Sequence, residues 1–146
     1  MNETIAAFRE EGRLALVGVS SKKSKFGNSI FKALKQRGLE VLPVHRTLAE
    51  IEGQKCYRSI GELPAGIESL VICTHGPEAS LLIGEARSKG IKRIWFQQGA
   101  DYSLATRAAR EADIDYVTGK CILMYAGRVT GIHAVHRFFA KLVGRY

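Results

Sequence analysis

The amino-acid sequence predicts an α/β protein with a parallel, doubly wound sheet. Short and almost continuously apolar runs alternate along the chain with segments whose apolar residues recur at helical spacing. Apolar runs of this kind are typical of parallel strands that are covered on both faces. Regular alternation of strands and helices implies right-handed crossovers between parallel strands. We therefore expect a Rossmann-like, five-stranded sheet with helices on both faces, in three α/β/α layers.

The first part of the sequence predicts an N-terminal helix and then two strands joined by a helix. Ile5 and Phe8 lie on one face of the first helix, and Gly38 ends the second one. The segment that follows the second strand has no clear pattern and is expected to be irregular. The expected elements are a helix at 4–11, a strand at 13–19, a helix at 28–37 and a strand at 39–44.

The second part of the sequence continues the alternation. Pro77 is a favourable first residue for a helix, and Gly90 is typical of a helix end. Small residues give the next helix a packing face, and these are Ala105, Ala108 and Ala109. The expected elements are strands at 68–73, 91–96 and 114–117, and helices at 77–89, 103–112 and 131–143.

Size and composition predict one cytoplasmic domain over residues 1–146. The 146 residues suit a single domain, and no linker, repeat or low-complexity tract divides them. No apolar run is long enough to cross a bilayer, and the N-terminus lacks the pattern of a signal peptide. The three cysteines fit neither a zinc motif nor a disulfide framework.

The positive charge is concentrated in two places. The formal net charge is +8; no acidic residue follows Asp115, and a basic tail with Lys120 and four further cations comes after it. Lys22, Lys23 and Lys25 form a second basic group. Such charge favours a nucleotide, a nucleic acid or an acidic membrane, or is simply a solvated surface. No recognition helix or aromatic platform supports a nucleic-acid partner.

A candidate phosphate-binding loop follows the first strand. Gly18 permits close backbone approach, hydroxyl and ammonium groups follow it, and a helix opens after the loop, so that its dipole favours an anion. The loop matches neither the G-x-G-x-x-G nor the Walker pattern, and an ordinary strand–helix loop is the alternative. The candidate residues are Gly18, Ser20, Ser21, Lys22, Lys25, Phe26, Gly27 and Asn28.

The end of the second strand is basic. Val44 is followed by His45 and Arg46, where a cofactor with a free ribose diol would favour an acidic residue. A basic group suits a phosphorylated ribose instead. The 2′-phosphate of NADP and the 3′-phosphate of coenzyme A are the two alternatives.

The ends of the third and fourth strands supply further candidates, since ligands lie beyond the carboxyl ends of strands in such sheets. Thr74 and the loop backbone are expected to line the nucleotide, and His75 is a loop histidine or a catalytic one. Gln97 and Gly99 are expected to face the reactive end of the ligand.

No convincing catalytic or metal-binding set emerges from the sequence. Cys121 lies near the expected crevice and is either a reactive thiol or a buried structural residue, whereas Cys73 reads as a core residue. His133 and His136 are three residues apart on the expected last helix, but no carboxylate accompanies them, so a basic surface stripe is favoured over a metal site.

Together these segments resemble the stand-alone CoA-binding domain proteins, which are similar to the nucleotide-binding domain of the succinyl-CoA synthetase alpha subunit. The resemblance covers residues 10–123. It implies coenzyme A bound across the first three strand ends, with the adenosine 3′-phosphate near Val44, His45 and Arg46 and with Thr74 and Pro77 at the third strand. The motifs that carry it are V-G-V-S at 17–20, L-P-V at 42–44, C-Y-R-S-I-G-E-L-P at 56–64, V-I-C-T-H-G-P at 71–77 and G-I-K-R-I-W-F-Q-Q-G-A at 90–100.

Two departures from the family pattern concern the ends of the second and third strands. His45 and Arg46 replace a segment that often contains proline, and His75-Gly76-Pro77 replaces a pair of prolines. The phosphorylated histidine of the synthetase belongs to a second domain and is not transferred to His133 or His136.

The expected function is binding of coenzyme A or an acyl-CoA by a non-catalytic sensor or accessory module. The alternative is an NADP-dependent or acyl-CoA-handling enzyme subunit. Such an enzyme would need a domain that holds the substrate, supplied by a homodimer or by a partner subunit.

Overall fold

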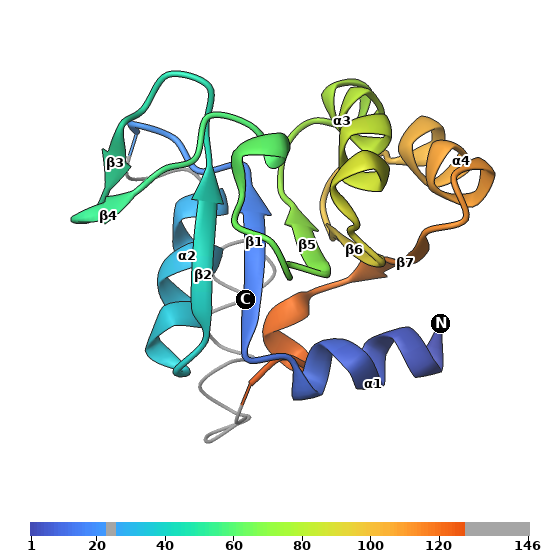
Figure 1. Ribbon diagram of the computed structural model, residues 1–146. Helices are drawn as coiled ribbons and strands as arrows, with labels where there is room; N and C mark the ends of the chain where they lie inside the picture. The colour runs from blue at the N-terminus through green and yellow to red at the C-terminus, as the bar shows by residue number, and fades with distance from the viewer. Residues whose placement is uncertain (23–25, 128–146) are drawn as a thin grey trace.

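The computed structural model describes residues 1–22 and 26–127 and has a five-stranded parallel sheet at its centre (Figure 1). The strand order is β2-β1-β5-β6-β7, and every pairing in this sheet is parallel. The predicted fold class, an α/β Rossmann-like sheet, is confirmed. The strands are β1 (Arg13–Val17), β2 (Glu40–Val44), β5 (Ser69–Ile72), β6 (Arg93–Gln97) and β7 (Asp115–Lys120).

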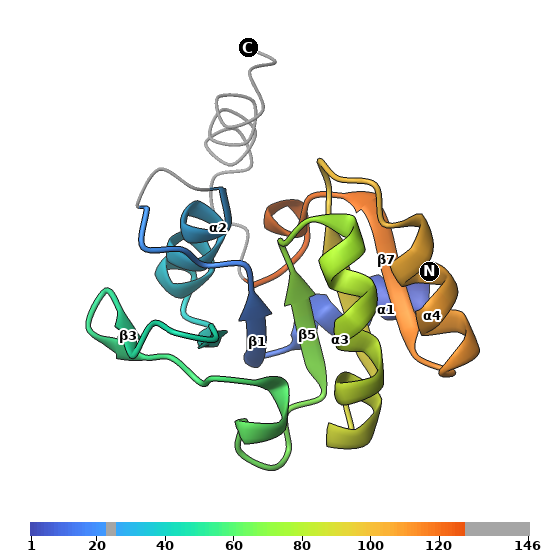
Figure 2. The same cartoon turned by 90° about the horizontal axis from the view of Figure 1, so that it is seen from above.

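Helices cover both faces of the sheet, as the view from above shows (Figure 2). Two helices and a short 3-10 turn pack on one face: α1 (Asn2–Glu10), α2 (Phe26–Gln36) and η2 (Ile122–Met124). The other face carries α3 (Gly76–Lys89), α4 (Ser103–Glu111) and η1 (Ile60–Glu62). The structure therefore has the three layers that the alternating pattern predicts.

Neighbouring aromatic residues of β6 anchor the two cores. Successive side chains of a strand point to opposite faces, so Trp95 and Phe96 enter different clusters and both are fully buried. Trp95 meets Phe8 of α1 edge-to-face at 5.2 Å between ring centroids, and its Nε1 donates to the carbonyl of Lys120. Phe96 packs on Tyr102 at 5.1 Å.

The segment between β2 and β5 is more regular than the sequence predicts. It contains an antiparallel hairpin of β3 (Glu50–Ile51) and β4 (Gln54–Lys55), followed by η1. The two hairpin turn residues, Glu52 and Gly53, have φ angles of 48° and 77°, which suits a tight two-residue turn. Strands of two residues are too short to produce a periodic pattern, so the expectation of an irregular segment was wrong here.

The last described strand is longer than predicted. β7 reaches Lys120, and its register with β6 shifts between Trp95 and Gln97. Gly119 has a φ of 74°, and a glycine at such a shift is typical of a bulge. The helix predicted at 131–143 lies outside the described residues.

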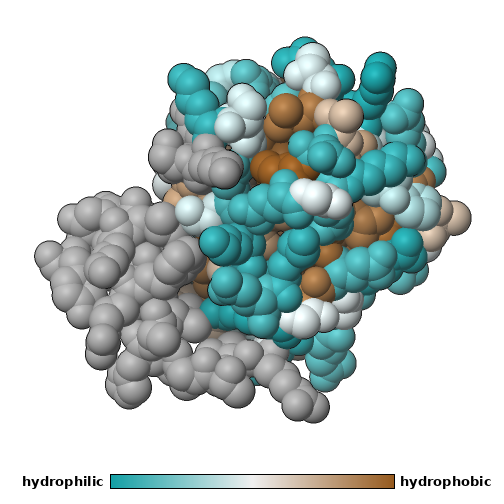
Figure 3. All heavy atoms as spheres, turned by 90° about the vertical axis from the view of Figure 1, so that its left-hand side faces the viewer, coloured by the Kyte–Doolittle hydropathy of each residue, from teal (hydrophilic) through white to brown (hydrophobic). Residues whose placement is uncertain are grey.

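The outer side of β2 is occupied by the segment that follows it. Pro43 has no N–H to offer, and its carbonyl accepts the N–H of Tyr57 at 2.8 Å. The Gln54 side chain donates to the carbonyl of Val41, and the N–H of His45 donates to the carbonyl of Tyr57. Figure 3 looks onto this side, where apolar side chains show between hydrophilic ones.

Among the described helices, none is long and apolar enough to span a membrane.

Candidate functional site

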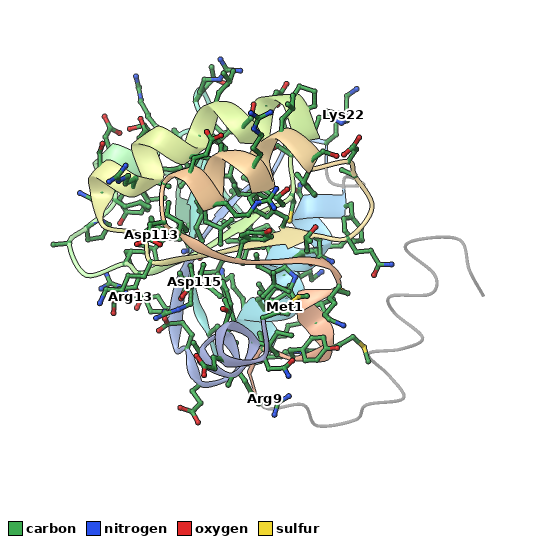
Figure 4. All side chains as sticks on the ribbon, turned by 90° about the vertical axis from the view of Figure 1, so that its right-hand side faces the viewer. Met1, Arg9, Arg13, Lys22, Asp113 and Asp115 are labelled. Carbon is green, nitrogen blue, oxygen red and sulfur yellow. The ribbon has the colours of Figure 1, made fainter. Side chains whose placement is uncertain are left out.

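The strand order reverses between β1 and β5, which makes this position the topological switch point of the sheet. β2 lies on one side of β1, whereas β5, β6 and β7 follow on the other, and ligands of doubly wound sheets bind at such switch points. A cleft of about 940 Å³ opens there at the carboxyl ends of the strands, a size that suits a small-molecule ligand. In Figure 4, Lys22 lies toward this end, and Arg13 and Asp115, which begin β1 and β7, lie toward the other.

Two glycines bring the loop after β1 against its neighbours. Gly18 has a φ of +126°, and a Cβ there would lie 2.7 Å from the Cβ of Cys73. A Cβ on Gly27 would lie 2.0 Å from the carbonyl oxygen of Gly18. Only glycine at both positions allows the loop, the end of β5 and the first turn of α2 to meet this closely.

Asn28 holds the loop in place from behind. Its Oδ1 accepts the N–H of Ser20 at 2.7 Å, and its Nδ2 donates to the carbonyl of Ser20 at 2.7 Å and to that of Lys22 at 3.3 Å. Asn28 is 6% exposed. The loop thus stays beside the N-terminus of α2, whose free N–H groups and dipole favour an anion.

The end of β2 forms the basic wall of the cleft, with Val44, His45, Arg46 and Thr47. His45 Nδ1 accepts the N–H groups of Thr47 and Leu48 at 3.1 and 2.9 Å. An accepting Nδ1 assigns the ring proton to Nε2. His45 is therefore a neutral donor in this structure, and the positive charge at this position comes from Arg46.

The end of β5 forms the floor of the cleft through Cys73, Thr74 and His75. The Tyr102 hydroxyl donates to the carbonyl of Thr74 at 2.8 Å and fixes the backbone. Burial raises the pKa of Tyr102, so the hydroxyl keeps its proton. Thr74 Oγ1 is buried and has no hydrogen-bond partner among the described residues.

One further wall of the cleft was not predicted from the sequence. It consists of residues just before and within η1, together with one face of α3. The motif at 56–64 marks the first part as a family feature without indicating its chemistry, and the α3 part gave no signal. These residues are Arg58, Ser59, Ile60, Glu78, Leu81, Leu82 and Glu85.

Eight predicted binding residues line the cleft: Gly18, Ser20, Phe26, Gly27, Val44, His45, Arg46 and Thr74. Ser21, Lys22, Asn28, Pro77 and Gly99 are not among its lining residues, and Lys25 lies outside the described part of the chain. Gln97 is 1% exposed and turned inward. Its Nε2 donates to Cys121 Sγ and its Oε1 accepts the N–H of Ile122, each at 3.0 Å.

The structure decides between the two alternatives for Cys121. It is 3% exposed in the core beneath Gln97, which agrees with a buried structural residue and not with a reactive thiol at the cleft. Cys73 packs against the core, as expected, and also lines the cleft, which the sequence did not predict. Burial raises the pKa of both thiols, so both are protonated at neutral pH.

The described ranges contain no group of three or more histidine, cysteine or acidic side chains that could hold a metal ion. His133 and His136 lie outside these ranges.

Comparisons with known proteins identify relatives of the whole described domain. Residues 12–126 match the family model described as a CoA binding domain. The chain is 41% identical to a conserved hypothetical protein from Pyrococcus furiosus, covering 79% of this chain and 97% of that one with a TM-score of 0.72. A hypothetical protein from Pyrococcus horikoshii OT3 is 27% identical with a TM-score of 0.76, over 95% of this chain and 92% of that one.

A larger relative contains the same domain as a part. The alpha subunit of an ADP-forming acetate–CoA ligase II from Pyrococcus furiosus is 30% identical over 82 residues, which are 56% of this chain and 18% of the subunit. The match thus spans under a fifth of that protein. Since the family model matches most of the chain, and the described residues form the sheet and cleft expected of it, the chain belongs to the CoA-binding domain family.

Proposed function

We propose that the cleft binds coenzyme A or an acyl-CoA, and that the protein acts as a non-catalytic sensor or accessory module. One observation carries this proposal: the glycine loop after β1 and the basic end of β2 line one continuous cleft. Coenzyme A carries a diphosphate and, across its ribose, a separate 3′-phosphate. The loop after β1 and the basic end of β2 lie on neighbouring strand ends, so the cleft offers one region for the diphosphate and another for the 3′-phosphate.

The residues of the cleft have distinct tasks in this proposal. The N–H groups of the loop and of the first turn of α2 hold the diphosphate. Arg46 binds the 3′-phosphate with its guanidinium, and neutral His45 donates from Nε2. Thr74 lines the cleft between these two regions, and its carbonyl is held by the Tyr102 hydroxyl.

The chemistry of the cleft supports binding over catalysis. The thiol that lines it, Cys73, is held in its protonated form by burial, whereas nucleophilic attack requires the thiolate. The relative that is a ligase subunit is far longer than the matched part. We infer that residues 12–126 provide the CoA site, and that any reaction at the bound ligand uses groups from outside this cleft, such as those of a second copy or a partner subunit.

The test is thermal denaturation with coenzyme A, dephospho-CoA, NADP and NAD. A ligand that binds only the folded state raises the melting temperature with concentration. We expect a rise with coenzyme A that is smaller with dephospho-CoA. A rise with NADP alone would assign the cleft to a reductase, and no rise with any of the four would contradict the proposed function.

A further inference from the structure

A segment for which the sequence indicated no chemistry joins β2 to α3 along the cleft. This bridging segment (residues 57–63) is tied to β2 by two backbone hydrogen bonds of 2.8 Å, which join Tyr57 to Pro43 and to His45. At its middle, Glu85 Oε1 of α3 accepts the N–H of Ile60 at 2.8 Å. The side chains of Ile60 and Leu63 are buried in the core. The segment is therefore fixed to both β2 and α3, although it contains no strand.

These ties determine where Arg58 lies. Tyr57 pairs with Val44 across the bridge, so the next residues, Arg58 and His45, extend side by side into the cleft lining. The N–H of Arg58 donates to Glu62 Oε2 at 3.2 Å, which fixes its backbone. The side chain is exposed.

Arg46 and Arg58 both line the cleft, and each comes shortly after one residue of the Val44–Tyr57 bridge, where the backbones of β2 and the bridging segment pair. Neither forms an ion pair with a carboxylate in the described ranges, where the ion-paired cations are Arg13, Lys92, Arg93 and Arg107. His45 between them is a neutral donor because its Nδ1 accepts two N–H groups. Two unpaired, planar cations and a neutral donor suit a doubly charged, three-oxygen anion better than they suit a singly charged diester.

We propose that Arg58 is a specificity-determining residue that joins Arg46 in binding a phosphate monoester, the 3′-phosphate of coenzyme A, and that Glu85 is the positioning residue that holds Arg58 there. This inference rests on the proposed function. Glu85 lies in the same wall as Arg58, and its Oε1 is engaged by the N–H of Ile60.

The experiment is calorimetric titration of Arg58→Gln and of the full-length wild type with coenzyme A, dephospho-CoA, adenosine 3′,5′-bisphosphate and NADP. Loss of one charged hydrogen bond weakens binding about 10- to 100-fold. We expect that loss for coenzyme A and the bisphosphate, and a change below about two-fold for dephospho-CoA, which lacks the monoester. Arg110→Gln, on exposed α4 outside the cleft lining, removes the same charge and should alter nothing.

The tie at Glu85 is tested by a matched pair. Glu85→Gln keeps an oxygen that can accept the N–H of Ile60, whereas Glu85→Ala removes it. We expect Glu85→Ala alone to lower the preference for coenzyme A over dephospho-CoA. Equal affinities of the two variants for both ligands would overturn the positioning role.

The outcomes separate this inference from the proposed function. If Arg58→Gln weakens the binding of coenzyme A and of dephospho-CoA equally, or changes neither, the proposed role of Arg58 is wrong although the proposed CoA binding is not contradicted. A wild type that binds neither coenzyme overturns both. A preference for NADP that depends on Arg58 keeps the monoester pocket and overturns coenzyme A as its source.

Discussion

Asn28 and Ser20 exchange two hydrogen bonds of 2.7 Å, from the Ser20 N–H to Oδ1 and from Nδ2 to the Ser20 carbonyl. One side chain in the first turn of α2 thus fixes both backbone groups of a residue in the loop after β1. The loop and the helix N-terminus behave as one unit because of this pair. The proposed diphosphate site depends on that unit.

Replacing Asn28 should affect both stability and ligand binding. Asn28→Ala loses both bonds to Ser20, and we expect unfolding to become easier by about 1–2 kcal/mol. Asn28→Asp keeps an oxygen for the Ser20 N–H, but its second oxygen would face the carbonyls of Ser20 and Lys22 with no proton to donate, so it should unfold at least as readily as Asn28→Ala. It also places a negative charge beside the bound phosphate, so it should bind coenzyme A more weakly. Urea denaturation and calorimetry measure the two orders, and tighter binding by Asn28→Asp would contradict a phosphate at this position.

Two glycine substitutions should have opposite effects. A methyl group on Gly27 would meet the Gly18 carbonyl at 2.0 Å, and we expect Gly27→Ala to cost about 3 kcal/mol, at the upper end of overpacking effects. Gly84 in α3 has open space around a Cβ, so Gly84→Ala should gain about 1 kcal/mol of stability from helix propensity. Both are read from melting temperatures. A tolerated Gly27→Ala would mean that α2 and the loop are not packed in this way.

Arg46→Glu should discriminate between two forms of the ligand. The reversed charge faces the 3′-phosphate of coenzyme A in the proposed complex, whereas dephospho-CoA has no group there. We expect coenzyme A to bind at least about 100-fold more weakly, a loss larger than that of one charged hydrogen bond, with a much smaller change for dephospho-CoA. Arg110→Glu is the charge-matched control on α4. An equal loss for both ligands would remove Arg46 from this role.

Gln97 should matter for stability and not for ligand affinity. Gln97→Leu leaves the N–H of Ile122 buried without the partner that it has now, which costs about 1–3 kcal/mol. Gln98→Leu is the control, since the Gln98 side chain has no hydrogen bond to a described residue and is half-buried. Guanidinium denaturation and a CoA titration of both variants provide the comparison. Weakened CoA binding by Gln97→Leu, with stability unchanged, would restore the original expectation of a ligand contact.

Stability should fall in alkaline solution because the folded protein holds its thiols protonated. Burial raises the pKa of Cys73, Cys121 and Cys56, while a thiol in the unfolded chain ionises near pH 8.5. The raised folded pKa gives stability that is fully present below about pH 8.5 and is lost as the pH rises above it. Each thiol contributes a slope of at most about 1.4 kcal/mol per pH unit. In Cys73→Ala, the free energy of unfolding should fall less steeply between about pH 9 and 10.5 than in the wild type, whereas the slopes between about pH 6 and 8 should be equal. Parallel plots of this free energy for the two proteins above about pH 9 would contradict the prediction.

The alternation of apolar runs was sufficient to predict the sheet and its helices, since buried parallel strands such as β5 and β6 leave a continuous signal. The β3–β4 hairpin was not predictable in this way because each strand has two residues. The end of β7 was missed for another reason: Gly119 and Lys120 look like a turn, and only pairing with β6 makes them part of a strand.

For the site, the sequence was informative where topology alone fixes a position. Gly18, Val44 and Thr74 line the cleft because the carboxyl ends of neighbouring parallel strands meet at one edge. Arg58 could not be found by that argument, since its position depends on the contact of Ile60 with Glu85, 25 residues away. Gln97 follows the rule for strand ends, but its amide turns to Cys121 and Ile122 instead.

The sealed side of β2 has a consequence for self-association. Exposed strand borders can recruit further strands and seed aggregation. Here Pro43 withholds a donor, and the carbonyls of Val41 and Pro43 are already engaged by Gln54 and Tyr57. Among the described residues, the border of β2 beside the cleft therefore offers few free backbone groups for pairing with a strand of another molecule.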